Sequence, residues 1–326
     1  MNIRSLRIVY MGTPEFAVAP LETLLDAGCN VVAVITAPDK PAGRGKKIRI
    51  SAVKQFALKQ DPEFPILQPS NLKDPDFLKD LSDLQPDLQV VVAFRMLPER
   101  VWRIPRLGTF NLHASMLPQY RGAAPINHAI INGETETGVT TFMIDEQIDT
   151  GRILLQKRTT IGDQETAGDL HDRLMSLGAG VVMETVTRLT AGTLKAQSQD
   201  RFIHKKAALK NAPKIYREHC QISWNLPGKK VHNLIRGLSP YPGAFTNLEK
   251  SNGVKVLCKI FSSTFEDSGH TESPGTLLSD NKSFLKAAVV DGYIQIQSIQ
   301  LEGKRRMDVK DFLAGFSLSS GLYRFS

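Results

Sequence analysis

The chain has 326 residues, of which 41% are hydrophobic and 23% are charged. These proportions exclude a disordered, collagen-like or coiled-coil protein, and the length corresponds to about two domains. No apolar run approaches the ~20 residues of a membrane-spanning helix, and the first residues run from a strand into a turn rather than into a cleavage site. Cys29, Cys220 and Cys258 lie too far apart for a disulfide framework or a metal-binding pair. The composition therefore predicts a soluble, cytoplasmic protein.

Charge is distributed unevenly along the chain. Residues 1–200 contain 22 basic and 23 acidic residues, whereas residues 201–326 contain 19 basic and 10 acidic residues. The net charge is therefore −1 on the first part and +9 on the second. Such an asymmetry indicates a module that faces a polyanion, although a lysine-rich solvated surface would give the same numbers. Charge alone leaves both interpretations open.

Strand and helix patterns alternate through the first ~190 residues, which predicts a doubly wound, mostly parallel α/β sheet. The first turn contains only Gly12 before Thr13, Pro14 and Glu15, and so lacks the three glycines of a dinucleotide fingerprint. A nucleotide-binding Rossmann enzyme is therefore disfavoured. The expected elements are the strands Leu6–Met11, Val31–Thr36, Leu88–Phe94, Phe110–Ser115 and Val139–Ile144, and the helices Phe16–Ala27 and Met175–Leu189.

The C-terminal part has a different pattern, in which short apolar runs are separated by Gly, Ser, Asp and Asn. This pattern predicts a small barrel or sandwich of β-strands. We expect a catalytic domain over residues 1–200, a linker over residues 201–214 and a basic β-domain over residues 215–326. The strands expected in that domain are Val254–Phe261, Gly275–Leu278, Leu285–Val290 and Tyr293–Leu301.

Candidate catalytic side chains gather between Gly108 and Gly151. Asn111 and His113 are two apart on an expected strand, so they point to the same side, near the carboxyl edge where open α/β sheets bind ligands. Asp149 follows the next expected strand. A strand histidine is most often structural, and an Asp-Thr-Gly sequence is most often a turn, so spacing alone leaves a structural role open.

Longer stretches resemble a known family. The sequence FNLHASMLPQYRGAAPI at 110–126, together with IDTG at 148–151, resembles the 10-formyltetrahydrofolate-dependent formyltransferases. Further matches are MGTPEFA at 11–17, PDKPAGRGKK at 38–47, ETGVTTFMID at 136–145 and GKRRM at 303–307. These matches cover nearly the whole length in order, and they are most similar to the members that act on methionyl-tRNA.

The resemblance implies a reaction and a set of residues. It implies formyl transfer from 10-formyltetrahydrofolate to initiator Met-tRNA, with Asn111, His113 and Asp149 as the catalytic trio. The sequence contains no HExxH motif or Cys/His cluster, so we expect no metal, and we expect a monomer. It also implies a Rossmann-like catalytic domain followed by a barrel that resembles an OB-fold, a scaffold suited to nucleic acids. The candidate folate-binding residues are Ser115, Met116, Leu117 and Pro118, and the candidate tRNA-binding residues are Arg44, Lys46, Lys47, Lys206, Lys210, Lys304 and Arg305.

Departures and alternatives accompany this interpretation. Gln119 stands where the family usually has a basic residue, and Phe94, Arg95 and Met96 replace a more usual tyrosine and glycine. A formyltransferase acting on a sugar nucleotide, or a formyl-folate hydrolase domain, would share the trio, but neither predicts a basic C-terminal part. A nucleic-acid-binding protein with an inactive formyltransferase-like domain is a further alternative, and the intact trio disfavours it.

Overall fold

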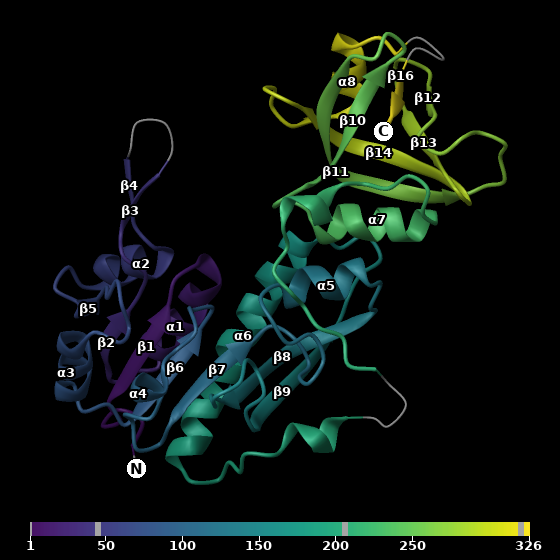
Figure 1. The fold of residues 1–326 in the computed structure, drawn as a ribbon. Coiled ribbons are helices and arrows are strands. Elements are labelled where there is room, and N and C mark those ends of the chain that lie inside the picture. Colours follow the sequence, from purple (N-terminus) through teal and green to yellow (C-terminus); the bar gives the residue numbers. More distant parts are fainter. Residues whose placement is uncertain (1, 43–46, 204–207, 319–322) are drawn as a thin grey trace. The chain divides into compact units, whose positions relative to one another are not determined.

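The computed structural model describes residues 2–42, 47–203, 208–318 and 323–326. The chain divides into two compact units, each drawn as a ribbon in Figure 1. The first unit comprises Met1–Gly122, Thr137–Thr159 and His171–Asn211. The second comprises Ala123–Glu136, Thr160–Leu170 and Ala212–Ser326, so it includes two segments from the first 200 residues.

The first unit is built on one sheet with the strand order β5-β2-β1-β6-β7-β8-β9. The pairs from β5 to β7 are parallel, and β8 runs antiparallel to β7. This arrangement confirms the expected mostly parallel α/β sheet. The strands are β1 (Ile8–Gly12), β2 (Val31–Ile35), β5 (Ile66–Leu67), β6 (Leu88–Val92), β7 (Thr109–His113), β8 (Glu136–Met143) and β9 (Ile153–Thr160).

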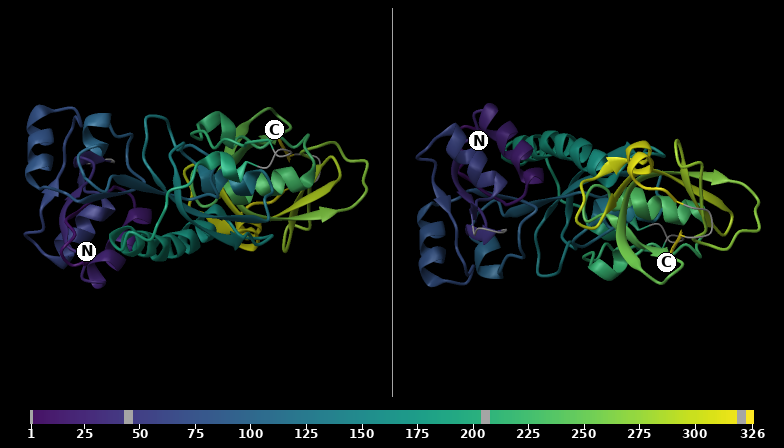
Figure 2. Two further views of the ribbon diagram at one scale, coloured as in Figure 1. Left: turned by 90° about the horizontal axis from the view of Figure 1, so that it is seen from below. Right: turned by 90° about the horizontal axis from the view of Figure 1, so that it is seen from above.

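Helices lie on both faces of this sheet (Figure 2). One face packs the strand residues Val9 and Met11 against Phe77, Leu81 and Val101, which come from two of these helices. The helices are α1 (Val18–Asp26), preceded by the 3-10 turn η1 (Glu15–Ala17), α2 (Ala52–Gln60), α3 (Pro75–Asp83), α4 (Glu99–Trp102) and α6 (Ala167–Thr190).

Local sequence signals explain where these helices begin and end. The Ser51 side chain accepts from the Lys54 backbone N–H at 3.0 Å and caps α2, while Asp74 caps α3 in the same way. Gly28 adopts a positive φ of 71° just after α1. The helix α6 starts eight residues earlier than expected, because Thr166 and Asp169 form a reciprocal cap that the apolar pattern does not mark.

A separate two-stranded hairpin, formed by β3 (Lys40–Ala42) and β4 (Lys47–Arg49), extends from the first unit (Figure 1). The 3-10 turn η2 (Gln199–Phe202) follows α6. The expected linker, residues 201–214, begins inside this turn and makes contacts of its own, since the Lys210 carbonyl accepts from the Tyr120 backbone N–H at 2.6 Å.

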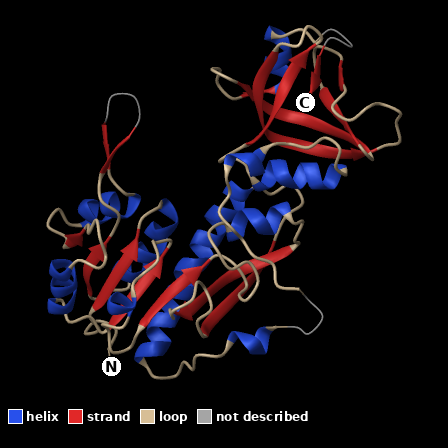
Figure 3. Cartoon of the chain, viewed as in Figure 1, coloured by secondary structure: helices blue, strands red, loops and turns tan. Residues whose placement is uncertain are grey.

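The second unit contains an antiparallel sheet with the order β12-β13-β14-β11-β10-β16, drawn in red in Figure 3. A bridge between Thr276 and Arg324 brings its two edges together, which makes a near-closed barrel as expected. The strands are β10 (Ala244–Lys250), β11 (Lys255–Asp267), β12 (Leu277–Ser279), β13 (Leu285–Val289), β14 (Gly292–Leu301), β15 (Met307–Asp308) and β16 (Tyr323–Phe325).

The barrel core is closed by helices and stacked aromatic rings. Val231 and Ile235 from α7, and Phe312 from α8, are buried among the strand residues. Trp224 stacks on Phe325 with ring centroids 5.1 Å apart. The helical elements of this unit are α5 (Pro125–Ile131), η3 (Arg217–Cys220), α7 (Gly228–Gly237) and α8 (Val309–Gly315). No helix among the described residues is long and apolar enough to cross a membrane.

Candidate active site

Asn111 and His113 occupy the carboxyl half of β7, between β6 and β8. The intervening residue, Leu112, faces α6, because a Cβ added to Gly178 of that helix would lie 2.7 Å from the Leu112 side chain. Asn111 and His113 therefore point to the opposite face of the sheet. The Asn111 side chain is half-buried, and no described residue hydrogen-bonds its carboxamide. That carboxamide is available to a ligand.

The His113 ring is held by a backbone carbonyl. Its Nε2 lies 2.8 Å from the carbonyl oxygen of Tyr120, and because a carbonyl only accepts, this nitrogen donates. The ring edge packs against Phe142, with centroids 6.5 Å apart. In the neutral imidazole the other nitrogen, Nδ1, is then an acceptor. It lies 3.7 Å from Oδ2 of Asp149, which is too far for a direct hydrogen bond.

Asp149 sits in a turn that fixes both its backbone and its carboxylate. It has a positive φ of 56°, an uncommon conformation for a residue with a side chain. Its Oδ2 accepts from the Gly122 backbone N–H at 2.8 Å. The following Gly151 cannot carry a side chain, because a Cβ there would lie 1.6 Å from the Met143 carbonyl oxygen. The structure therefore brings all three candidate catalytic residues to one face and edge of the sheet.

A second carboxylate in the same turn has a different environment. Asp145 accepts from the Thr150 hydroxyl at 2.8 Å and from the Gln147 backbone N–H at 3.2 Å through one oxygen. Both contacts lie within the turn itself. Asp145 thus stabilises the loop that presents Asp149, whereas Asp149 faces His113.

Gln199 supports this turn, although it was not among the residues expected from the sequence. Its side chain is buried and donates to the carbonyls of Asp149 at 2.9 Å and Gly151 at 2.8 Å. Its own oxygen accepts from the Arg121 guanidinium at 2.6 Å. No sequence motif marks this residue, because its partners are backbone carbonyls 48 and 50 residues earlier.

The four candidate folate-binding residues differ in what they offer a ligand. The Ser115 hydroxyl donates to the Gln119 carbonyl at 2.7 Å, and Leu117 packs inside the domain with Phe142. Pro118, which follows a cis peptide bond, is buried as well. The side chain of Met116 alone in this set is half-exposed. The segment is thus held rigidly, and contact with a ligand through Ser115 or Leu117 would be through backbone groups.

The loop after β6 lies at the same edge of the sheet, because β6 and β7 are parallel neighbours. Arg95 donates through its guanidinium to the carbonyls of Pro69 and Ser70, the latter at 2.9 Å, and thereby ties this loop to the segment after β5. Met96 is 73% exposed, and Ile148, beside Asp149, is 63% exposed. Apolar side chains left in solvent at a sheet edge suit the walls of a site for a flat ligand.

The candidate tRNA-binding residues are only partly described. Arg44, Lys46 and Lys206 lie outside the described residues, and so does the side chain of Lys47 in β4. Lys210 is exposed, and its backbone N–H donates to the Gln119 side chain at 2.8 Å. Lys304 and Arg305 are exposed in the turn between β14 and β15.

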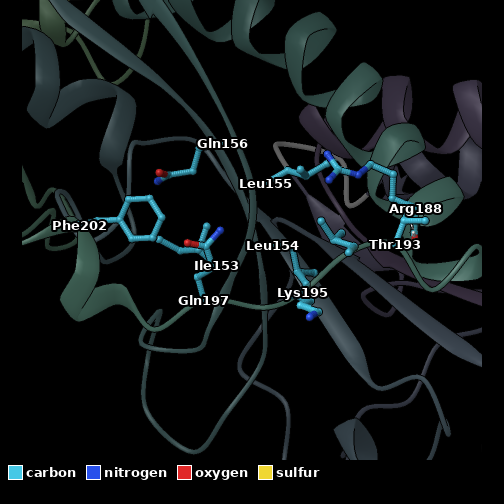
Figure 4. A pocket seen from close by; sticks show the side chains of 10 residues that line it. Ile153, Leu154, Leu155, Gln156, Arg188, Thr193, Lys195, Gln197 and Phe202 are labelled. Carbon is cyan, nitrogen blue, oxygen red and sulfur yellow. Dashed lines mark hydrogen bonds between the residues drawn. The ribbon is translucent and has the colours of Figure 1, made fainter.

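A separate hollow of about 530 Å³ runs along β9 (Figure 4). Figure 4 places Phe202 and Gln156 at one end and Arg188 and Thr193 at the other. None of the trio lines it. Gln156 donates to the Leu117 carbonyl at 2.7 Å, so this hydrogen bond from β9 helps to hold the segment 115–118 in place. Among the described residues, no group of three or more His, Cys, Asp or Glu side chains could hold a metal ion.

Comparison with known proteins identifies two consecutive family matches. A family model described as formyl transferase matches residues 6–186, and one described as formyl transferase, C-terminal domain, matches residues 214–317. The chain is 52% identical over 319 residues to the methionyl-tRNA formyltransferase of Bacteroides fragilis, covering 98% of each chain. It is 50% identical over 317 residues to that of Flavobacterium johnsoniae, covering 97% of this chain and 98% of the relative.

Among solved structures, the fold is similar to a sugar 3N-formyl transferase, WlaRD, solved in the presence of dTDP and 5-N-formyl-THF. The TM-score is 0.64 at 20% identity, over 94% of this chain and 100% of that chain. HypX from Aquifex aeolicus, in complex with tetrahydrofolic acid, gives a TM-score of 0.63 at 17% identity, over 97% of this chain and 48% of that chain. At these identities the likeness concerns the fold.

Proposed function

Because the chain belongs to the formyl transferase family, we propose that it transfers the formyl group of 10-formyltetrahydrofolate to the α-amino group of initiator methionyl-tRNA. The observation that carries this proposal is the sequence identity of 50–52% to methionyl-tRNA formyltransferases, which extends along nearly the whole length of both chains. The arrangement of Asn111, His113 and Asp149 supports it, because these side chains supply the groups that the reaction needs. The protein acts as a monomer in this proposal.

The reaction requires stabilisation of a negative charge. Attack of the methionyl amine on the formyl carbon converts the formyl oxygen into an oxyanion. The carboxamide of Asn111, on the face of β7 opposite α6, donates to this oxygen. A preorganised donor of this kind typically contributes ~10²–10³ in rate. His113 adds a second donor through Nδ1 when that nitrogen carries a proton, and the Asp149 carboxylate at 3.7 Å stabilises the resulting positive charge.

The reaction also requires one proton to change place. The attacking amine becomes an ammonium in the tetrahedral intermediate, and the folate nitrogen must gain a proton as its bond to the formyl carbon breaks. Asp149 takes the proton from the ammonium, directly or through a water molecule. One proton is then delivered to the folate nitrogen as it leaves, so the reaction neither gains nor loses a proton. General acid–base help of this type is worth ~10²–10⁴ in rate. No covalent enzyme intermediate is needed.

The folate site in this proposal lies between the loop after β6 and the segment 115–118. Met96 and Met116 offer exposed or half-exposed apolar surface to the flat pterin ring, while the backbone of the rigid 115–118 segment offers hydrogen-bonding groups. Arg95 holds the first of these walls through its two carbonyl contacts.

Recognition of tRNA relies on charge. Residues 201–326 carry a net charge of +9, and phosphate contacts dominate the affinity of proteins for nucleic acids. Lys210, Lys304 and Arg305 are exposed cations in this part of the chain, joined in the proposal by Lys206. In the first unit the basic sequence PAGRGKK, with Arg44, Lys46 and Lys47, brings the acceptor end of the tRNA to the site.

Selective loss of tRNA binding tests this assignment. Lys304→Ala combined with Arg305→Ala should weaken binding of Met-tRNA and reduce the slope of log affinity against log salt by about 2, because two phosphate contacts are lost. Affinity for 10-formyltetrahydrofolate should not change. An unaltered salt slope would show that the turn between β14 and β15 is a solvated surface without a role in tRNA binding.

A further inference from the structure

The hairpin formed by β3 and β4 needs support from outside itself. It forms a sheet of only two strands, and such a ribbon is at best marginally stable alone. Its register places Lys40 directly opposite Arg49, and like charges in that position destabilise a strand pair. Both side chains are exposed, and no described acidic side chain pairs with either. Two unpaired cations on a marginally stable hairpin are consistent with binding of a polyanion, if the base of the hairpin is anchored. We call this hairpin, β3 and β4, the arm.

The first strand of the hairpin begins at such an anchor. Asp39 immediately precedes β3, and its carboxylate accepts from the Lys54 ammonium at 2.6 Å and from the Gln68 amide at 2.8 Å. Lys54 also donates to the Gln68 side-chain oxygen at 2.6 Å, and Gln68 donates to the Ala37 carbonyl at 2.8 Å. Three side chains from three parts of the unit therefore close one hydrogen-bonded network.

The network is half-buried and internally complete. The side chains of Lys54 and Asp39 are 18% and 29% exposed. The hydrogen bonds from Gln68 and then from Lys54 hold the pKa of the Asp39 carboxyl below its usual value. The Lys54 ammonium already has two acceptors, so it differs from the free cations on the hairpin. Its contacts indicate a structural task rather than direct binding of a phosphate.

The second strand of the hairpin is fastened nearby. The chain leaves β4 at Arg49 and reaches Ser51, whose hydroxyl accepts from the fully buried hydroxyl of Thr36 at 2.7 Å and caps α2. Thr36 follows β2 directly. Both ends of the hairpin are thus tied to the central sheet and to α2, which fixes the direction in which the arm extends from the unit (Figure 1).

We propose that Asp39, Lys54 and Gln68 are positioning residues for tRNA, which hold the β3–β4 hairpin in the direction that lets its cations meet the phosphate backbone. The inference rests on the proposed function, because it assumes that the hairpin contacts tRNA. None of the three side chains touches a substrate. Their contribution is to fix the base of the hairpin before tRNA binds, so that this part need not be ordered on binding.

One substitution separates electrostatics from positioning, because the two predict opposite changes in the reaction with Met-tRNA. Asp39→Ala removes a negative charge, and electrostatics alone would then strengthen binding of a polyanion. The proposal expects the reverse in the full-length protein: kcat/KM for Met-tRNA falls by about tenfold or more, because the arm is misplaced. The matched control is Glu63→Ala, which removes the same charge from an exposed side chain between α2 and β5 and should leave the reaction unchanged.

A second variant removes the network without any change of charge. Gln68→Leu should lower kcat/KM for Met-tRNA to a similar extent, with an unchanged Kd for 10-formyltetrahydrofolate as evidence that the unit is folded. If Asp39→Ala and Gln68→Leu both match Glu63→Ala, the inference is wrong. Arg44→Ala, assayed in parallel, separates the two claims. If this variant also transfers formyl normally, the hairpin's part in the proposed function fails, whereas a loss confined to Arg44→Ala contradicts only the positioning network.

Discussion

His113 faces two oxygen atoms with its two ring nitrogens, and the two distances differ. Nε2 lies 2.8 Å from the carbonyl oxygen of Tyr120, whereas Nδ1 lies 3.7 Å from Oδ2 of Asp149. The ring is therefore oriented by the backbone of Tyr120, and Asp149 is not bound to it directly. The space beside Nδ1 and Oδ2 is where a substrate amine can exchange its proton in the proposed reaction. This division of tasks makes each side chain testable on its own.

Asn111→Ala should lower kcat by about 10²-fold or more, because it removes a donor to the oxyanion. His113→Ala should lower kcat to a similar extent, because it removes the donor that the ring supplies when Nδ1 carries a proton. The Kd values for 10-formyltetrahydrofolate and Met-tRNA should change much less. Single-turnover formylation assays together with equilibrium binding measure both quantities. A variant that keeps near wild-type kcat would show that its side chain has another role.

Asp149→Asn should be at least about tenfold more harmful to kcat than Asp145→Asn, because only Asp149 can take a proton from the substrate amine. Asp145 accepts two hydrogen bonds within its own turn, and an asparagine oxygen can keep accepting them. Each variant removes one negative charge, and the two positions are four residues apart, so the pair is matched in its electrostatic effect. Equal losses of kcat would mean that Asp149 serves the turn rather than the chemistry.

Gln199→Leu should lower both the melting temperature and kcat, because it leaves the part-buried carbonyl of Asp149 and the buried carbonyl of Gly151 without their donor. A buried polar group left unsatisfied costs ~1–3 kcal/mol. Gln197→Leu is the matched control, since that side chain is exposed and makes no described hydrogen bond. Calorimetry and kinetics on both variants check the prediction, which fails if the two variants behave alike.

His232 should make the stability of the second unit depend on pH. Burial is the main cause that lowers its pKa, and the neighbouring Arg236 lowers it further, while the hydrogen bond to the Asp163 carbonyl partly offsets both. A lowered pKa means that the folded state resists protonation. Stability associated with His232 is therefore intact above about pH 6.5, the ordinary pKa of histidine, and is lost as the pH falls below it.

The measurement is the melting temperature of the wild type and of His232→Gln between about pH 5 and about pH 8. The variant should be less stable at neutral pH, because its Ser263 and Asp163 contacts are altered, and the difference between the two proteins should shrink as the pH falls. Other titratable groups are present in both proteins, so their contributions cancel in the difference between the two melting temperatures. A difference that stays constant would show that His232 does not titrate in this way.

The sequence could predict the sheet and the trio because both depend on side-chain patterns. Buried strands such as β1 and β6 appear as apolar runs, and a spacing of two places Asn111 and His113 on one side of a strand. The Tyr120 carbonyl and the Gln199 amide could not be predicted in the same way. Their positions depend on turns with positive φ at Tyr120 and Asp149, and backbone carbonyls carry no mark in the sequence.

The order of residues along the chain also does not reveal which segments cluster into which compact unit. The segments 123–136 and 160–170 lie within the first 200 residues, yet they cluster with the barrel. Arg236 explains part of this arrangement, since its guanidinium donates at 3.1 Å to the carbonyls of Gly162 and Glu165. A buried arginine on a helix gives no indication, from its sequence alone, of which distant loop it will hold.

One assay tests the central proposal most directly. The purified full-length protein is incubated with 10-formyltetrahydrofolate and, in separate reactions, with initiator Met-tRNA, free methionine or a nucleotide-linked amino sugar. Formation of N-formylmethionyl-tRNA alone, abolished by His113→Ala, is the predicted result. Formylation of the amino sugar in preference to Met-tRNA, or release of formate without transfer to any acceptor, would contradict the proposed function.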